Sequence, residues 1–406
     1  MEYRPLDPAE FDALIRMLGG AFGEDAAASD REEVRLIFET GRTWGGYDAG
    51  ELVGCSGACA FDLTTPGGTV GTAGITTVAV LPTHRRRGVM REVLRRQVDE
   101  LHQEGHPTAY LWASEGAIYQ RFGYGTGAPA AAFDIRKHRT AFLRPHQPAG
   151  RVRLIERSEA FKAFPSVYDR VRPGQPGMLD RPGPWWELRF HDSPEDREGA
   201  SSYFFALHEA PDGPDGYVVY RVKHDWSSVS GVSEGMMDVE ELVAATRGAY
   251  ADLWRFCFDV DLIGRIKGFK RPVDEPLLHM LAEPRALGLR FRDGTWLRLI
   301  DVPAALEARR YAVADRVRLE VRDEFCPWNE GTWELQGGPE GASCTRFASE
   351  PDLVLDVSDL AGTYLGAVPF ATLARAGRVA EAKDGAVRRA DAMFAADLAP
   401  WCPHIF

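Results

Sequence analysis

Two kinds of apolar pattern follow each other in the first part of the chain. Residues 75–80, Ile-Thr-Thr-Val-Ala-Val, are rich in β-branched types and predict a strand. Pro82 ends this strand, because proline cannot supply a ladder N–H. From Val89 the apolar residues fall at positions 89, 93, 94, 98 and 101, which is the stripe of an amphipathic helix. A second apolar run, residues 109–113, predicts another strand.

The turn between the first strand and this helix is basic and contains a glycine, in the order Arg85-Arg86-Arg87-Gly88. Free N–H groups and the positive end of the helix dipole meet at a helix N-terminus, so an anion is favoured there. Gly88 lets a ligand approach the backbone, and arginine side chains pair with phosphate oxygens. A short Arg-Arg-x-Gly run alone favours a solvated turn. The flanking strands and the tyrosine-containing segment after them favour a pyrophosphate cradle.

The remaining pattern divides the chain further. Asp7 and Glu10 predict a capped helix that continues to about Leu18, and residues 144–150 are typical of a linker. The elements predicted after the linker are a helix at 158–172, strands at 203–208, 217–223 and 236–239, and a helix at 240–256. Residues 290–406 alternate short strands with helices.

Composition narrows the function. A chain of 406 residues predicts two or three domains. Its 48 basic and 60 acidic side chains leave a net charge of −12, which argues against general nucleic-acid binding and suits cationic amines. The six cysteines lack paired CxxC spacing, so neither a disulfide scaffold nor a zinc site is predicted. Without a signal peptide or a run of about 18 apolar residues, we expect a cytoplasmic protein with no membrane span.

Two segments resemble a known family. Val78-Ala79-Val80 followed by Arg86-Arg87-Gly88-Val89-Met90-Arg91 resembles the acetyl-CoA signature of GNAT N-acetyltransferases. Residues 112–125, Trp-Ala-Ser-Glu-Gly-Ala-Ile-Tyr-Gln-Arg-Phe-Gly-Tyr-Gly, resemble the corresponding segment of the Eis aminoglycoside acetyltransferases of actinobacteria. The chain length and the aromatic last residue agree with that family. Met90 departs from the Gly or Ala of the general signature and narrows the room beside the phosphates.

The resemblance implies an α/β (α+β) architecture with tandem GNAT-like domains, the second degenerate, and a sterol-carrier-protein-like C-terminal domain. The expected domains are a catalytic domain at 1–145, a degenerate domain at 150–287 and the sterol-carrier-like domain at 290–406. Acetyl-CoA is the implied cosubstrate, with no metal, and the implied assembly is a homohexamer.

The resemblance also implies which residues form the site. The expected cofactor-binding residues are Val78, Ala79, Val80, Arg86, Arg87, Gly88, Val89, Met90, Arg91, Ser114 and Glu115. The expected substrate-binding residues are Phe22, Glu24, Asp25, Phe38 and Trp44. Carboxylates in this set would bind ammonium groups, and aromatic rings would stack on them. For any one of these residues, a surface acidic loop or a core aromatic is the simpler interpretation.

Two groups are expected to move protons. Tyr119, with an ordinary phenol pKa near 10, would protonate the departing thiolate of the cosubstrate; Tyr124 is the rival, but it follows Phe122-Gly123 and is expected to pack. The resemblance assigns removal of the amine proton to the terminal carboxylate of Phe406. Its ordinary pKa of roughly 3.5 makes it a weak base, acting through water or by holding the ammonium. Glu115, Glu24 and His84 are the alternative bases.

Three functions follow as hypotheses. The first is acetyl-CoA-dependent N-acetylation of aminoglycoside or polyamine-like primary amines by direct transfer in a ternary complex. The second is acetylation of protein lysine side chains. The third is a non-enzymatic CoA- or lipid-binding module in which the sterol-carrier-like domain is the functional part. The fold alone does not establish a lipid tunnel.

Overall fold

The computed structural model describes residues 1–406 except 24–30, 32–33, 36 and 39–41. The described chain forms two compact units. The first unit comprises Met1–Gly127, Thr295–Asp397 and Phe406, and the second comprises Ala128–Gly294 and Leu398–Ile405. The predicted substrate residues Glu24 and Asp25 lie outside the described residues.

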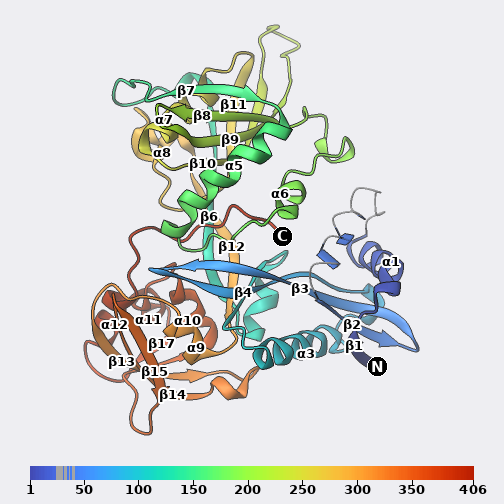
Figure 1. Ribbon diagram of the computed structural model, residues 1–406, viewed down its shortest axis with the longest axis vertical. Helices are drawn as coiled ribbons and strands as arrows, with labels where there is room; N and C mark the ends of the chain where they lie inside the picture. Colours follow the sequence, from blue (N-terminus) through green and yellow to red (C-terminus); the bar gives the residue numbers. More distant parts are fainter. Residues whose placement is uncertain (24–30, 32–33, 36, 39–41) are drawn as a thin grey trace. The chain divides into compact units, whose positions relative to one another are not determined.

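The first unit begins with a sheet in the order β1-β2-β3-β4-β5-β12. Its strands are β1 (Glu2–Pro5), β2 (Arg42–Asp48), β3 (Glu51–Thr65), β4 (Gly68–Val80), β5 (Thr108–Trp112) and β12 (Arg290–Leu299). The helices are α1 (Phe11–Phe22), α3 (Val89–Gln103) and the short α4 (Gly116–Tyr119). Figure 1 shows α3 alongside β2 and β3, which it contacts. The residues at the predicted stripe of α3 are all buried.

The Asp7 capping box is confirmed, since Asp7 accepts from Ala9 and Glu10 reaches back to the Asp7 amide. Helix α1 runs beyond the predicted end at Leu18. Ala21 is still buried, and the left-handed Gly23 forms the C-cap with its amide bonded to the carbonyl of Gly19.

The second unit contains a sheet in the order β6-β11-β10-β9-β8-β7. Its strands are β6 (Gly125–Arg136), β7 (Arg151–Ile155), β8 (Phe204–Ala210), β9 (Gly213–Lys223), β10 (Gly235–Ala244) and β11 (Ile263–Arg271). Its helices are α5 (Arg157–Val171), α6 (Pro184–Arg189), α7 (Arg247–Asp259) and α8 (Leu277–Met280). The prediction that a helix begins at residue 240 is wrong. Strand β10 stays paired with β9 as far as Ala244, and Thr246 then caps α7.

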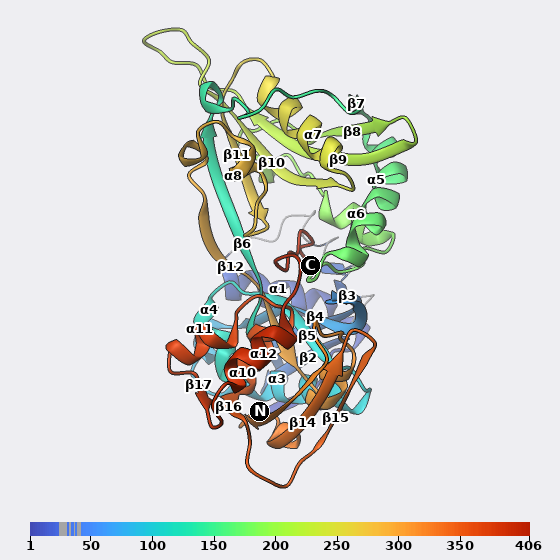
Figure 2. The ribbon, with the colours of Figure 1, turned by 90° about the vertical axis from the view of Figure 1, so that its left-hand side faces the viewer.

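The C-terminal part of the first unit is a five-stranded sheet in the order β15-β14-β13-β16-β17. Figure 2 shows helices α10–α12 grouped beside β16 and β17. The elements are α9 (Val302–Glu307), β13 (Asp315–Arg322), β14 (Gly331–Gly338), β15 (Gly341–Arg346), β16 (Leu353–Asp356), α10 (Val357–Tyr364), α11 (Phe370–Arg375), β17 (Val379–Glu381) and α12 (Ala386–Phe394). The predicted mixture of short strands and helices in this region is confirmed.

The six cysteines are buried free thiols, and Cys55 and Cys59 lie in the core side of β3. No helix among the described residues is both long and apolar enough to cross a bilayer.

Candidate active site

Strands β4 and β5 separate at the middle of the first sheet. They pair in parallel only from Thr72 and Thr108 to Ile75 and Leu111. Beyond this point β4 continues to Val80 with β3 on one side, while β5 has ended. On the side away from β3, no strand among the described residues pairs with residues 76–80. The unpaired edge of β4 therefore offers backbone N–H and C=O groups to a ligand.

The backbone is distorted where the two strands separate. The register between β3 and β4 shifts between Cys55 and Gly57, and Thr77 opposite them has φ of +50°. A positive φ is unusual for a β-branched residue and marks a strained position. The Cys55 thiol donates a hydrogen bond to the Thr77 carbonyl (2.9 Å). Bulges of this kind re-aim a strand beside functional sites.

Helix α3 begins beside this edge without a side-chain cap. Its N-cap residue, Gly88, has φ of +84°, and no side chain bonds to the first turn. A Cβ built on Gly88 would meet no heavy atom within 4 Å. Arg86, just before it, is also in the left-handed region, with φ of +62°. The first-turn amides of α3 and the open space at Gly88 therefore suit an anion.

A cavity of about 660 Å³ joins the β4 edge to the start of α3. Among the described residues that line it, four are arginines and one is a glutamate, so the lining favours a polyanion. Ten of the predicted cofactor-binding residues line it, namely Val78, Ala79, Val80, Arg86, Gly88, Val89, Met90, Arg91, Ser114 and Glu115. Met90 is half-buried and packs against the apolar clusters on both sides of α3. The volume and the charge fit a nucleotide-bearing thioester cosubstrate.

Arg87 is the predicted cofactor residue that the structure does not bring into this cavity. Its guanidinium donates to Asp48 Oδ2 (3.1 Å), and His84 Nε2 lies 3.2 Å from the same oxygen. Hydrogen bonds from His84 and Arg87 lower the pKa of the Asp48 carboxyl. Because Arg87 pairs with a residue of β2, its charge is directed to the protein and not to the cavity.

The cavity is also lined by Ala21, Arg85, Ile118, Arg121 and Phe122, which lie outside the predicted set of cofactor-binding residues. Arg85 donates to the carbonyls of Val80 (3.2 Å) and Ala21 (2.8 Å), which ties the basic turn to β4 and α1. Arg121 is exposed and adds positive charge to the cavity lining from the segment after α4. The sequence signal that could have identified Arg121 was its position directly after Tyr119-Gln120, within the tyrosine-containing segment.

Tyr119 lies next to the cavity and does not itself line it. Its side chain, 5% exposed, packs in the same apolar cluster as Ile118 and Phe122, which do line the cavity. Burial raises the pKa of Tyr119 to about 12. The ring of Tyr124 lies 5.7 Å away, and the Tyr124 hydroxyl is fully buried with no partner among the described residues. Of the two phenols, Tyr119 is the less enclosed.

The chain ends against β3 and β4. The ring of Phe406 lies 5.2 Å from the ring of Phe61 on β3. A Cβ on Gly74 of β4 would come within 2.6 Å of the Phe61 ring and 3.0 Å of the Phe406 ring, so glycine makes room for this pair of rings. Gly74 lies three residues before the strained Thr77, which places the terminal residue close to the point where β4 and β5 separate.

The predicted acceptor residues are only partly brought together. Phe22, at the end of α1, is 53% exposed and lines the cavity. Phe38 packs its ring 5.8 Å from that of Phe11, and Trp44 donates from Nε1 to Glu100 on α3 (2.7 Å). Neither Phe38 nor Trp44 lines the cavity.

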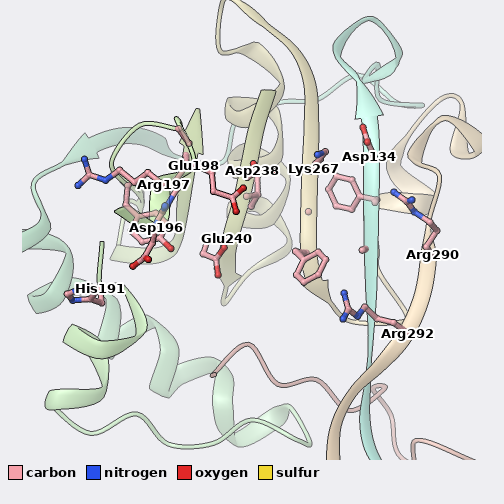
Figure 3. A pocket seen from close by; sticks show the side chains of 18 of the residues that line it. Asp134, His191, Asp196, Arg197, Glu198, Asp238, Glu240, Lys267, Arg290 and Arg292 are labelled. Atoms are coloured by element: carbon pink, nitrogen blue, oxygen red, sulfur yellow. The ribbon is translucent and has the colours of Figure 1, made fainter. Parts of the chain in front are cut away.

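A second cavity, of about 940 Å³, lies on the sheet of the second unit (Figure 3). Asp238, Lys267 and Asp134 stand on three neighbouring strands, and Lys267 is directly opposite both carboxylate-bearing residues. Such cross-strand charge pairs stabilise an exposed sheet face. The lining holds five acidic side chains (Asp134, Asp196, Glu198, Asp238 and Glu240) and five basic ones (Arg197, Arg221, Lys267, Arg290 and Arg292). This charge-balanced surface lacks the anion preference of the first cavity.

Three family models match successive parts of the chain. An acetyltransferase (GNAT) domain model matches residues 2–127, a second acetyltransferase (GNAT) domain model matches 177–299, and a sterol carrier protein domain model matches 302–403. The predicted fold class, two GNAT-like domains followed by a sterol-carrier-like domain, is therefore confirmed.

Similar proteins cover the whole chain. An N-acetyltransferase of Streptomyces avermitilis is 42% identical over 98% of this chain and 96% of its own length. The N-acetyltransferase Eis of Mycobacterium tuberculosis is 37% identical over 86% of this chain and 84% of its own. The crystal structure of Eis1 from Mycobacterium abscessus superposes with a TM-score of 0.87 at 33% identity, over all of both chains. The protein is an N-acetyltransferase that belongs to the Eis family of GNAT enzymes.

Proposed function

We propose that this enzyme transfers the acetyl group of acetyl-CoA directly to a primary amine of a small cationic molecule, of the aminoglycoside or polyamine class, within a ternary complex. One observation carries the proposal. A single cavity joins the unpaired edge of β4, the uncapped start of α3 and a lining of arginines. Acyl transfer from CoA needs these three features together: a strand edge for the thioester arm, amides for the diphosphate and cations for the phosphates.

The chain's own groups would hold acetyl-CoA as follows. The amides of the first turn of α3, next to Gly88, would donate to the diphosphate, and Arg86, Arg91 and Arg121 would pair with phosphate oxygens. The edge of residues 76–80 would bond the pantetheine amides, and one of its N–H groups would polarise the thioester carbonyl.

Tyr119 is the proposed proton donor to the departing sulfur. With its pKa raised to about 12 by burial, the phenol stays protonated throughout the physiological range. The same shift makes it a weaker acid than a solvated tyrosine. Proton transfer from Tyr119 therefore requires that the cofactor sulfur lie in equally poorly hydrated surroundings. Such surroundings raise the pKa of the thiol as well, so the thiolate remains basic enough to take the proton. Tyr119 then contributes by donating a hydrogen bond that strengthens as negative charge develops.

The terminal carboxylate of Phe406 is the proposed acceptor of the amine proton, directly or through water, and it would also hold the ammonium by its charge. Its support is the packing of the Phe406 ring against Phe61 and beside Gly74. Glu115 and His84, which both line the cavity, are alternative bases. His84 is a weaker alternative because it already lies within hydrogen-bond distance of Asp48.

The proposed acceptor is cationic because the chain carries a net charge of −12, which draws amines toward it. Phe22 lines the cavity and offers an exposed ring for cation–π contact. Glu24 and Asp25 remain predicted ammonium partners. The competing lipid-carrier function is disfavoured by Arg309. This buried side chain donates to the carbonyls of Tyr364 and Phe394, and it places a charge inside the C-terminal domain where a lipid needs an apolar lining.

Release of free thiol from acetyl-CoA tests the function. The assay compares a kanamycin-type aminoglycoside, a polyamine and a lysine-containing peptide at equal concentration. We expect thiol release with the small amines, and product masses that increase by one or more acetyl groups. Release only with the peptide favours protein lysine acetylation, and binding of CoA without release for any amine favours a non-enzymatic module. The predicted homohexamer is tested separately by light scattering on the purified protein.

A further inference from the structure

The segment after β13, Asp323–Asn329, reaches from the C-terminal domain to two walls of the cofactor cavity. The ring of Phe325, 3% exposed, lies at its centre. It meets the ring of Phe122 edge-on at 5.2 Å, and the guanidinium carbons of Arg95 and Arg91 lie 3.9 and 5.7 Å from its centroid. Phe122 and Arg91 line the cavity from opposite elements, the turn after α4 and the first turn of α3.

This segment is held firmly in place by buried polar contacts. Arg298 is wholly buried, and it donates to Asp323 (2.5 Å) and to the carbonyl of Gly123 (3.3 Å), next to Phe122. Asp323 also accepts from the Cys326 amide and from the side chain of Asn329, both at 2.9 Å. Phe325 is therefore fixed relative to the turn that carries Phe122.

A second contact fixes the segment to α3. Trp328 stacks on His102 of α3, with the ring centroids 4.3 Å apart, and its Nε1 donates to the carbonyl of Ile300 (2.8 Å). The segment thus contacts α3 near both of its ends, at Arg91 and at His102. It forms a brace between α3 and the turn after α4.

We propose that Phe325 is a positioning residue for acetyl-CoA: it holds the guanidinium of Arg91 and the ring of Phe122 in the arrangement that receives the phosphates. The proposal rests on the proposed function, in which this cavity binds acetyl-CoA. It gives the sterol-carrier-like domain a part in cofactor binding that needs no lipid.

The physical basis is preorganisation. Arg91 is exposed, and a free arginine side chain loses much rotamer entropy when it is fixed by a phosphate. The Phe325 centroid lies 5.7 Å from the Arg91 guanidinium, close enough to restrict this side chain before binding and to add a weak cation–π attraction. Arg95 stacks more closely on the same ring, at 3.9 Å, but does not line the cavity. Removing the ring while keeping an apolar side chain should therefore weaken binding of the cofactor, with little effect on the chemical step.

The test is a double-mutant cycle on the full-length enzyme, with Phe325→Leu, Arg91→Ala and the double variant. Affinity for CoA is measured by calorimetric titration and kcat by thiol release. We expect Phe325→Leu to raise the Kd for CoA about three- to fivefold with kcat changed less than twofold. In the Arg91→Ala background the same change should have a clearly smaller effect, because only the contact of Phe325 with Phe122 is then lost. Phe325→Tyr, which keeps a ring, should restore most of the affinity.

Phe347→Leu is the matched control. The guanidinium carbon of Arg318 lies 3.9 Å from the Phe347 ring in the same C-terminal domain, and neither residue lines the cofactor cavity. We expect its Kd for CoA to equal that of the parent enzyme. An unchanged Kd in Phe325→Leu, or an equal increase with and without Arg91, overturns the proposal. Failure of the parent enzyme to bind CoA would instead overturn the proposed function, and the two outcomes are distinct in the same titrations.

Discussion

In the first unit, residues 81–88 separate β4 from α3, whereas in the second unit only Ala245 and Thr246 separate β10 from α7. The longer connection leaves the start of α3 uncapped at Gly88. In the second unit the Thr246 hydroxyl accepts from the Ala249 amide (3.1 Å) and donates to Asp215 (2.7 Å). At the start of α7, the Thr246 side chain therefore already accepts a hydrogen bond from a first-turn amide that could otherwise bind an anion.

The strands before the two helices differ in the same way. Like β4, β10 has a register shift, between Val239 and Glu241, and it pairs with its parallel neighbour β11 only as far as Val239. Beyond that point Glu241 is buried and accepts from Arg181 (2.9 and 3.0 Å) and from Tyr217 (2.6 Å). The second unit keeps the GNAT layout but uses its polar groups internally. A GNAT-like outline therefore indicates a cofactor site only where these groups remain unsatisfied.

The largest expected effect is that of Tyr119→Phe. Removing the phenol hydroxyl takes away the proposed proton donor, and losing a general acid lowers kcat by about 10²- to 10⁴-fold. The KM for acetyl-CoA should hardly change, because Tyr119 does not line the cavity. Steady-state thiol release measures both constants.

Tyr124→Phe is the control for this variant. Its hydroxyl is buried and has no partner among the described residues, so its loss should leave both kcat and stability nearly unchanged. If Tyr124→Phe loses as much activity as Tyr119→Phe, or if Tyr119→Phe stays fully active, the assignment of Tyr119 is incorrect.

Gly88→Ala and Gly385→Ala compare the N-terminus of α3, where the diphosphate is proposed to bind, with the N-terminus of α12, where no ligand is proposed. Both glycines are N-caps with nearly the same backbone, φ and ψ of +84° and −1° at Gly88 and of +79° and +1° at Gly385. Alanine costs each helix roughly 1–2 kcal/mol of left-handed strain. Only Gly88→Ala also puts a methyl group where the diphosphate is proposed to lie, so we expect about a tenfold higher KM for acetyl-CoA in that variant alone. Equal KM values in the two variants would refute the cradle.

Arg86→Ala and Arg87→Ala separate two adjacent arginines. Arg86 lines the cavity, whereas Arg87 pairs with Asp48. A charge-assisted bond to a phosphate contributes about 1.5 kcal/mol, so Arg86→Ala should raise the KM for acetyl-CoA about tenfold. Arg87→Ala should change it less than twofold. A larger effect at Arg87 would show that its pairing with Asp48 breaks when the cofactor binds.

Thr246→Ala examines the second unit. Losing a threonine N-cap lowers the free energy of unfolding by about 1 kcal/mol, and the loss of the hydrogen bond to Asp215 adds to this. Chemical denaturation measures the change in stability. The KM for acetyl-CoA should stay at the parent value. If KM rises instead, the second unit takes part in cofactor binding after all.

Several features of the first unit that enter this comparison could be predicted from local sequence. The apolar stripe of α3, the glycine before it and the Asp7 cap depend on neighbouring residues, and each is observed. The strain at Thr77 could not be predicted, because threonine carries no sequence signal for a positive φ; it depends on the pairing with β3, some 20 residues earlier. The pairing of Arg87 with Asp48 depends in the same way on a distant strand. The start of α7 was misplaced because the polar pair Glu240-Glu241 looks helical, whereas β9 and the buried Arg181 hold it in a strand.

A crystal structure of the enzyme with acetyl-CoA tests the central claim most directly. We predict diphosphate oxygens within hydrogen-bond distance of the amides at residues 88–90, and the cofactor sulfur beside the hydroxyl of Tyr119. A cofactor bound at the second unit, or a Tyr119 hydroxyl separated from the sulfur by packed side chains, would contradict the account.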